Sequence, residues 1–361
     1  MTFRPVLWRT FDPDGGVHHY CRKPENVAAE VAWSTPDGRA TIHHGDCLEI
    51  LRGLPDASVN CCVTSPPYWG LRDYGVEGQM GLEPTPQEYV AGMVAVFREV
   101  RRVLKDDGTL WLNLGDSYAA STSNNGGYSD KSTLAGFTSP DTKGRRANDS
   151  GDARRLTHGL KPKDLVGIPW RVAFALQADG WYLRSDIIWS KPNPMPESVT
   201  DRPTKAHEYL FLLSKSERYH YDAESIAEPA ESAGKIGGFT PNAAIAAGVK
   251  PTGNMIAERG AAYVRKDTRN KRSVWQIPTE PFPGAHFAVM PTALVKPCIL
   301  AGCPTGGTVL DPFGGSGTVA VVALENGCGF VGCELNPEYV EIAKARIAPV
   351  AAQGSLFGGV S

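Results

Sequence analysis

Toward its C-terminal end the chain of 361 residues alternates short apolar strands with helices, and few folds accommodate such an alternation. The expected strands and helices are residues 308–311, 319–325, 329–334 and 337–347. The first strand ends in Asp311, the second ends in Glu334, and a glycine-rich turn at 312–318 follows Asp311. Strands and helices in this order build a mostly parallel sheet covered on both faces, with a site at the carboxyl edge of the strands. The predicted fold class is therefore α/β.

The same alternation extends upstream. We expect strands at 41–46, 58–62, 109–114, 182–189 and 207–214, and helices at 47–53, 86–104, 168–178 and 291–300. Residues 105–108 are expected to form a helix exit and a turn.

These elements define a domain at 41–348, preceded by an N-terminal arm or lead-in hairpin at 1–40 and followed by a tail at 349–361. Two stretches inside the domain differ in composition. Residues 119–160 are polar, with paired arginines, and predict a flexible basic loop that orders on a phosphate backbone. The alternative is a solvated linker. Residues 223–272 end in a cluster of basic side chains and predict an insertion that reads DNA.

Composition sets broad limits on the function. Hydrophobic residues make up 42% and charged residues 21%, as in soluble globular proteins, and the net charge of −2 neither supports nor excludes a nucleic-acid partner. No signal peptide or membrane span is recognised, which predicts a cytoplasmic protein without a membrane partner.

The eight cysteines are then expected to be free thiols. Cys298 with Cys303, and Cys328 with Cys333, have the spacing of a loose zinc site, but their apolar neighbours favour buried thiols. We expect no metal.

The sequence Thr-Ser-Pro-Pro-Tyr at 64–68 ends a buried strand in an unusual way. The prolines stop the strand and leave carbonyls free to accept hydrogen bonds, while Ser65 adds a hydroxyl and Tyr68 a flat ring. This pattern predicts a socket for the exocyclic amine of a flipped nucleobase: Ser65 and the Pro66 carbonyl hold the amine, and Tyr68, with Trp69 as a further candidate, stacks on the base. The alternative is a proline-rich turn in which Tyr68 belongs to the core. The predicted catalytic residues are Ser65, Pro66, Pro67 and Tyr68.

The turn at 312–318 predicts a second site. Its glycines let the backbone approach a ligand, and Glu334, about 20 positions further on, suits a ribose diol. The spacing at 315–320 also fits a nicotinamide fingerprint, so an oxidoreductase is a competing interpretation. Asp311 argues against it, because a carboxylate there favours a cationic amino-acid tail over an anionic pyrophosphate. The residues therefore predict S-adenosylmethionine as cofactor. The cofactor-binding candidates are Asp46, Asp311, Phe313, Gly314, Gly315, Gly317, Thr318 and Glu334.

With both motifs the chain resembles the amino-group DNA methyltransferases, in the permuted β-type order. Residues 64–68 resemble the family's catalytic motif, residues 311–318 its cofactor loop, and the segment at 291–294 the part that covers the cofactor. Residues 189–194 and 207–209 resemble its strand motifs. The resemblance implies a Rossmann-like, circularly permuted S-adenosylmethionine-dependent methyltransferase fold.

It also implies a site-specific enzyme that flips a base of double-stranded DNA and methylates it directly. Ser65 favours cytosine N4, because relatives with Asp at this position more often act on adenine N6, which remains the alternative. A cytosine-C5 enzyme needs a nucleophilic cysteine, and Cys298 lies in an apolar segment unsuited to that role. The resemblance leaves open a cognate restriction endonuclease, a homodimer, and a DNA-binding protein that has lost catalysis.

Overall fold

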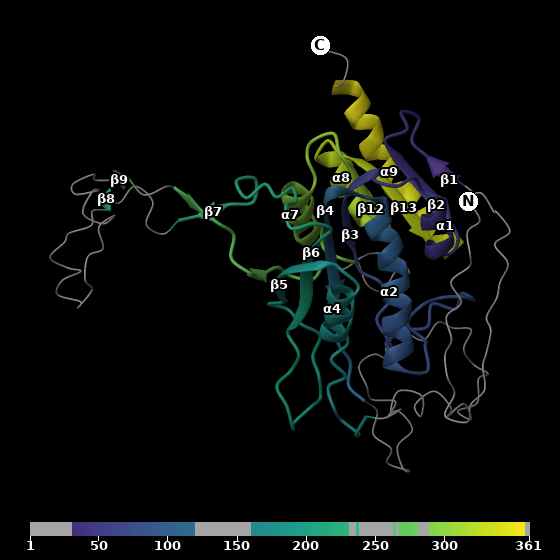
Figure 1. The fold of residues 1–361 in the computed structure, drawn as a ribbon, viewed down its shortest axis with the longest axis vertical. Coiled ribbons are helices and arrows are strands. Elements are labelled where there is room, and N and C mark those ends of the chain that lie inside the picture. The colour runs from purple at the N-terminus through teal and green to yellow at the C-terminus, as the bar shows by residue number, and fades with distance from the viewer. Residues whose placement is uncertain are drawn as a thin grey trace.

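The computed structural model describes residues 31–119, 160–230, 236–237, 263–264, 267–280 and 289–357. Within these residues a nine-stranded sheet carries helices on both faces (Figure 1). Its strands in chain order are β1 (Val31–Ser34), β2 (Ala40–His44), β3 (Val59–Thr64), β4 (Leu104–Leu114), β5 (Tyr182–Ser190), β6 (His207–Ser214), β11 (Val274–Gln276), β12 (Thr308–Asp311) and β13 (Gly329–Glu334). The helices are α1 (Cys47–Gly53), α2 (Pro86–Val103), α4 (Ile168–Ala178), α7 (Thr292–Gly302), α8 (Thr318–Glu325) and α9 (Pro337–Phe357). Two small sheets pair β7 (Glu228–Pro229) with β10 (Thr268–Arg269), and β8 (Ile236–Gly237) with β9 (Tyr263–Val264).

The strand order in the large sheet is β1-β2-β13-β12-β3-β4-β6-β5-β11. The run from β2 to β4 is parallel throughout, β6 is antiparallel to both of its neighbours, and β1 pairs antiparallel with β2. The predicted α/β class with a mostly parallel sheet is confirmed. In the middle of the sheet β12 pairs with β3, far from it in sequence, through Val309 with Cys61 and Leu310 with Cys62. Sheet pairing therefore brings the end of β3 beside the end of β12.

Each face of the sheet has its own core. Successive side chains of a strand point to opposite faces, so Trp111 of β4 packs with α7 and α8, whereas Leu110 and Leu112 pack with α1, α2 and α4. The helices α7, α8 and α9 cover one face, and α1, α2 and α4 cover the other. Each fully buried side chain of this size contributes about 1.5–3 kcal/mol by leaving water. The two cores hold the parallel strands in place, and the loops at their carboxyl ends are left to form a site.

Two features differ from the expected secondary structure. β4 begins at Leu104, where α2 ends, so the turn predicted at 105–108 is an irregular part of the strand. Leu104 both closes the helix, with its backbone N–H bonded to Val100, and pairs with Val59, which leaves no room for a separate turn. The last helix, α9, does not stop at Ile347 but continues to Phe357, into the predicted tail.

The strand β1 lies inside the predicted N-terminal arm and forms a hairpin with β2. Most of the predicted basic loop at 119–160 and much of the insertion at 223–272 lie outside the described residues. Among the helices that the structure describes, none combines the length and apolar character that crossing a bilayer requires.

Candidate active site

A pocket opens at the carboxyl edge of the parallel strands, between the loops that follow β2, β3, β12 and β13. Its empty volume is about 960 Å³, including the solvent at its mouth, which is the size of a small-molecule site. Nine of the predicted site residues line it: Asp46, Ser65, Pro67, Asp311, Phe313, Gly314, Gly315, Thr318 and Glu334. The two motifs, more than 200 residues apart in sequence, therefore face one space.

Asp311 joins these motifs. Its Oδ1 accepts a 2.6 Å hydrogen bond from Oγ1 of Thr64, the last residue of β3, and a 3.0 Å bond from the backbone N–H of Phe313. The residue is 1% exposed. Burial raises the pKa of its carboxyl to about 7, against the lowering effect of the two hydrogen bonds. A buried carboxylate of this kind gains stability from a cation placed in the pocket.

Glu334 holds the glycine-rich turn. Its Oε2 accepts a 2.7 Å hydrogen bond from the backbone N–H of Gly315, and its Oε1 a 2.8 Å bond from that of Asn336. Burial raises the pKa of this carboxyl. Gly315 has a φ of 51°, and a Cβ on Gly314 would lie 3.2 Å from the Cys333 carbonyl oxygen, so both positions favour glycine. The carboxylate and the bare backbone together form a cradle for a polar ring.

Gly317 and Thr318 begin α8. Gly317 does not line the pocket; it has a φ of 77°, and a Cβ there would lie 3.1 Å from the side chain of Ala343 on α9. Thr318 lines the pocket, and its hydroxyl and that of Ser316 accept bonds of 3.0 and 2.7 Å from Arg346. The second half of the turn is therefore fixed by its hydrogen bonds and close packing with α9.

Asp46 combines the two roles that its position at a strand end allows. It lines the pocket, and its Oδ1 also caps α1 by accepting a 3.0 Å bond from the backbone N–H of Glu49. Asp116, at the end of β4, caps α4 instead, through bonds from the backbone N–H groups of Gly167 and Ile168.

A further part of the pocket lining was not predicted. It is formed by a loop after the proline turn and by residues on either side of the glycine turn: Tyr74, Val76, Gly78, Gln79, Met80, Val289, Met290, Asn336 and Tyr339. The rings of Tyr74 and Tyr339 meet edge to face with centroids 6.4 Å apart. None of residues 291–294, the segment expected to cover the cofactor, lines the pocket; Val289 and Met290, directly before that segment, line it instead. Residues 70–82 carry no periodic pattern that would have placed them there.

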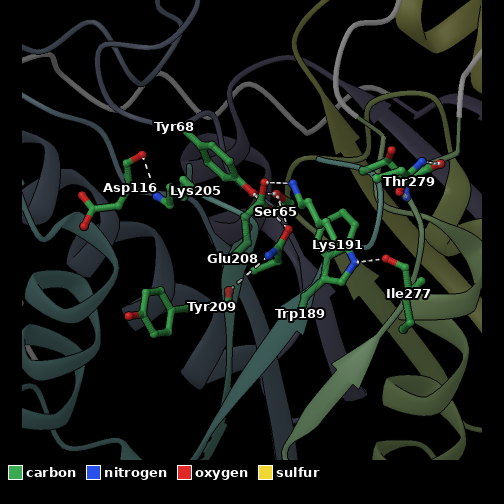
Figure 2. Close-up of polar contacts among 12 residues, drawn as sticks. Ser65, Tyr68, Asp116, Trp189, Lys191, Lys205, Glu208, Tyr209, Ile277 and Thr279 are labelled. Atoms are coloured by element: carbon green, nitrogen blue, oxygen red, sulfur yellow. Dashed lines mark hydrogen bonds and ion pairs between the residues drawn. The ribbon is translucent and has the colours of Figure 1, made fainter. Parts of the chain in front are cut away.

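Beside the pocket, Ser65 and Tyr68 enter a network of polar side chains (Figure 2). The Tyr68 hydroxyl donates to Glu208 Oε2 at 2.7 Å and lies 3.0 Å from Asn113 Oδ1. The Ser65 hydroxyl lies 3.3 Å from both the Tyr68 oxygen and Asn113 Oδ1. Lys191 forms an ion pair with the other oxygen of Glu208. Burial and the neighbouring Glu208 carboxylate raise the pKa of Tyr68, so its hydroxyl remains protonated.

The positions of the rings test the expectation for the proline turn. Tyr68 lies against Gly115, where a Cβ would come within 2.4 Å of its ring, and it is only partly buried. Trp69, in contrast, is 1% exposed and its indole N–H donates to the Glu83 carbonyl, so it belongs to the core and the idea that it stacks on a base is wrong. The Pro67 carbonyl accepts a 2.9 Å bond from Tyr89.

Sequence reasoning missed Asn113, Lys191 and Glu208 as members of the site. The segments 189–194 and 207–209 had been recognised as motifs, but no local signal joins them to Ser65. These three residues meet because β6 lies between β4 and β5 and runs antiparallel to both. The start of β6, with Glu208, therefore lies beside the ends of β4 and β5.

The cysteines that the structure describes lie in the two cores. All seven in the described part of the chain are free and buried, and no cluster of three or more potential metal ligands occurs among the described residues. Cys298, inside α7, bonds its thiol to the Leu294 carbonyl at 3.2 Å, and burial raises its pKa, the opposite of what a nucleophile requires.

Comparisons with known proteins agree with one another. A family model described as DNA methylase matches residues 59–345. The Type II methyltransferase M.Cfr9I of Citrobacter freundii is 51% identical over 308 residues, which cover 85% of this chain and 87% of the relative. M.SmaI of Serratia marcescens, also a Type II methyltransferase, is 50% identical over 304 residues, with 84% and 89% covered. Among solved structures, the PvuII DNA methyltransferase (cytosine-N4-specific) superposes with a TM-score of 0.54 at 19% identity, covering 92% of this chain and 90% of the other. This last likeness confirms the predicted fold.

Proposed function

The chain belongs to the N6/N4 family of DNA methylases, and from that premise we propose that it methylates the exocyclic N4 of a cytosine in duplex DNA, with S-adenosylmethionine as methyl donor. The observation that carries the proposal is the shared pocket: Ser65 and Pro67 line it together with Asp311 and Glu334. Family membership also accounts for the glycine pattern at 315–320 without a nicotinamide cofactor.

The residues of the pocket suit an adenosine with a charged amino-acid tail. Glu334 lies at the glycine cradle, where a carboxylate can accept from the two hydroxyls of a ribose. Asp311 is a buried carboxylate that a cationic tail would keep ionised. Phe313, Val289 and Met290 supply apolar surface for the purine. When bound, S-adenosylmethionine supplies a methyl group on a positively charged sulfur.

The chain's own task is to present the amine nitrogen. An exocyclic amine is a weak nucleophile, because its lone pair is delocalised into the ring. The Ser65 oxygen and the Pro66 carbonyl each accept one N–H, which favours a pyramidal nitrogen with its lone pair directed into the pocket. Tyr68 contributes a face for the base that has left the helix. Positioning the amine against the donor in this way lowers the barrier without a covalent intermediate on the enzyme.

Cytosine N4 is favoured over adenine N6 by the serine at position 65. Adenine remains the second candidate, because the same acceptors would hold an N6 amine equally well. The two Type II relatives suggest a further proposal, that the enzyme is the modification half of a restriction–modification system with a cognate endonuclease. We further propose that the enzyme acts as a homodimer and that the insertion at 223–272 reads the target sequence.

Labelled methyl transfer tests the proposed activity. Purified enzyme, tritiated S-adenosylmethionine and duplex DNA should give labelled DNA, and digestion to nucleosides should place the label in N4-methylcytosine. Label in N6-methyladenine would correct the base and leave the reaction class intact. Unlabelled DNA across a set of genomic substrates would favour a DNA-binding protein without catalysis.

A further inference from the structure

The side chains at the ends of β3, β4, β5 and β6 form a chain of hydrogen bonds that all run in one direction. Ser65 donates inward, to Tyr68 or to Asn113 at 3.3 Å, and Tyr68 donates to Glu208 at 2.7 Å. The network ends at Glu208, 16% exposed, and its partner Lys191, 18% exposed (Figure 2). Neither charged residue lines the pocket.

The direction follows from the donors available. Two oxygens that only accept lie near the Tyr68 hydroxyl, and the charged Glu208 oxygen at 2.7 Å is nearer and stronger than the Asn113 amide oxygen at 3.0 Å, so the single proton is directed to Glu208. The Tyr68 oxygen then accepts from Ser65. Asn113 agrees with this direction, because its Nδ2 donates to the Tyr209 carbonyl at 3.1 Å and its Oδ1 consequently faces the two hydroxyls.

Lys191 fixes Glu208 in turn. Its Nζ pairs with Oε1 and lies 4.2 Å from the centre of the Trp189 ring, while the Trp189 indole donates to the Ile277 carbonyl at 2.8 Å. The cation therefore has a stacked position between β5 and the carboxylate, and it holds one oxygen of Glu208 so that the other faces Tyr68.

We propose that Glu208, held by Lys191, is a positioning residue that sets the direction of these hydrogen bonds. As a result, Ser65 donates its proton away from the pocket, to Tyr68 or Asn113, and presents its lone pairs to the target amine. The inference rests on the proposed function, since it assigns the substrate of the network as the amine. A hydroxyl that donated toward the pocket instead would meet the N–H of the amine proton to proton. Glu208 thus acts through Tyr68 and Ser65 without touching the base.

A double-mutant cycle tests this route. In Glu208→Gln the cation keeps the amide oxygen, so the amide N–H₂ faces Tyr68, and the Tyr68 proton turns to Asn113 Oδ1, 3.0 Å away, where it competes with Ser65 for the inward acceptor. The methyl-transfer rate under single turnover should fall about tenfold or more, with unchanged affinity for S-adenosylmethionine. In a Tyr68→Phe background, which removes the connecting hydroxyl but keeps the ring, the same substitution should change the rate less than about twofold. Equal effects in both backgrounds would overturn the proposal.

A rescue experiment separates direction from simple structural damage. Replacing the cation by Lys191→Met in the Glu208→Gln protein frees the amide to turn its oxygen toward Tyr68. The double variant should recover at least part of the lost rate, whereas a purely structural role predicts a further loss. Glu341→Gln is the matched control, because it removes a carboxylate from an exposed ion pair with Lys344 on α9.

The outcomes separate this inference from the activity itself. No label in DNA with the unmodified enzyme would reject the proposed function. Normal methylation by Glu208→Gln, with the unmodified enzyme active, would reject only the role of Glu208.

Discussion

At the scale of single residues, the site depends on a few atoms at the tip of β3. Ser65 faces the pocket, while Tyr68 is held between Gly115 and the carboxylate of Glu208. Sequence alone predicted that this turn belongs to a site, because a serine, two prolines and a ring are adjacent, and Ser65 and Pro67 do line the pocket, while their role toward a base stays a prediction. The sequence could not show which of the two adjacent rings, Tyr68 or Trp69, is buried in the core, because that depends on the loops that cover them.

Removing the hydroxyl or the ring should abolish methylation while sparing the cofactor. Ser65→Ala removes one acceptor for the amine, and Tyr68→Ala removes the proposed stacking surface. Each variant should lose at least about 100-fold in methyl transfer. Calorimetry should find S-adenosylmethionine affinity within about threefold of the unmodified enzyme. Near-normal transfer by either variant would remove the assignment of this turn.

Gly115 offers an independent test of where the Tyr68 ring lies. A Cβ in Gly115→Ala would come within 2.4 Å of the ring, at a distance that atoms do not tolerate, so the ring must move. We expect a large fall in the methyl-transfer rate without a matching loss of cofactor affinity. Wild-type activity in this variant would mean that the ring position is irrelevant to transfer.

Asp311 predicts a pH dependence of cofactor binding. Burial raises its pKa from 3.8 to about 7, so below about pH 7 the free pocket holds a protonated, neutral carboxyl. A cationic ligand favours the ionised form, so binding must release this proton, and affinity should rise as pH increases from about 5.5 to 7. The stability of the ligand-free protein should change in the opposite direction and fall as pH rises from about 4 to 7, because in this range the unfolded chain has already released the proton that the folded chain still holds. Calorimetry across this range measures the slope, and Asp311→Asn should flatten it; an unchanged slope in that variant would assign the titration to another group.

At the scale of elements, the sequence predicted most helices and strands because apolar periodicity and end signals coincide. Thr85 caps α2 one residue before the predicted start of this helix, and α4 begins and ends at the predicted residues. The failures come from contacts between residues that are far apart in sequence. Residues 105–108 look like a turn, but pairing of Leu104 with Val59 draws them into β4. Residues 74–80 carry no periodic pattern, and their place in the pocket lining is set by contacts with distant loops. The sequence therefore could not predict it.

The junction of α8 and α9 should tolerate no added side chain. Gly317→Ala would put a Cβ 3.1 Å from Ala343 on a residue whose φ is 77°. Strain of this kind costs on the order of 1–3 kcal/mol. Thermal unfolding should show a lower midpoint, with Gly306→Ala as a control, since Gly306 has the same φ of 77° and open space around it. Equal losses in the two variants would mean that backbone strain alone, and not the contact with α9, is responsible.

At the scale of the whole molecule, circular permutation changes the order of the motifs and leaves the sheet intact. β12 sits between β13 and β3, so the cofactor loop and the proline turn share one edge although they come from opposite ends of the chain. The sequence predicted this meeting because the carboxyl ends of parallel strands gather on one side. It could not predict the contribution of Glu208 and Lys191, which depends on the antiparallel placement of β6.

The central claim is that donor and target amine meet in this single pocket. A crystal structure with S-adenosylhomocysteine, the demethylated form of the donor, examines it most directly. The account predicts the ribose beside Glu334, the amino-acid tail beside Asp311, and the sulfur facing Ser65. A ligand bound in another cleft, or one whose sulfur points away from Ser65, would contradict the account.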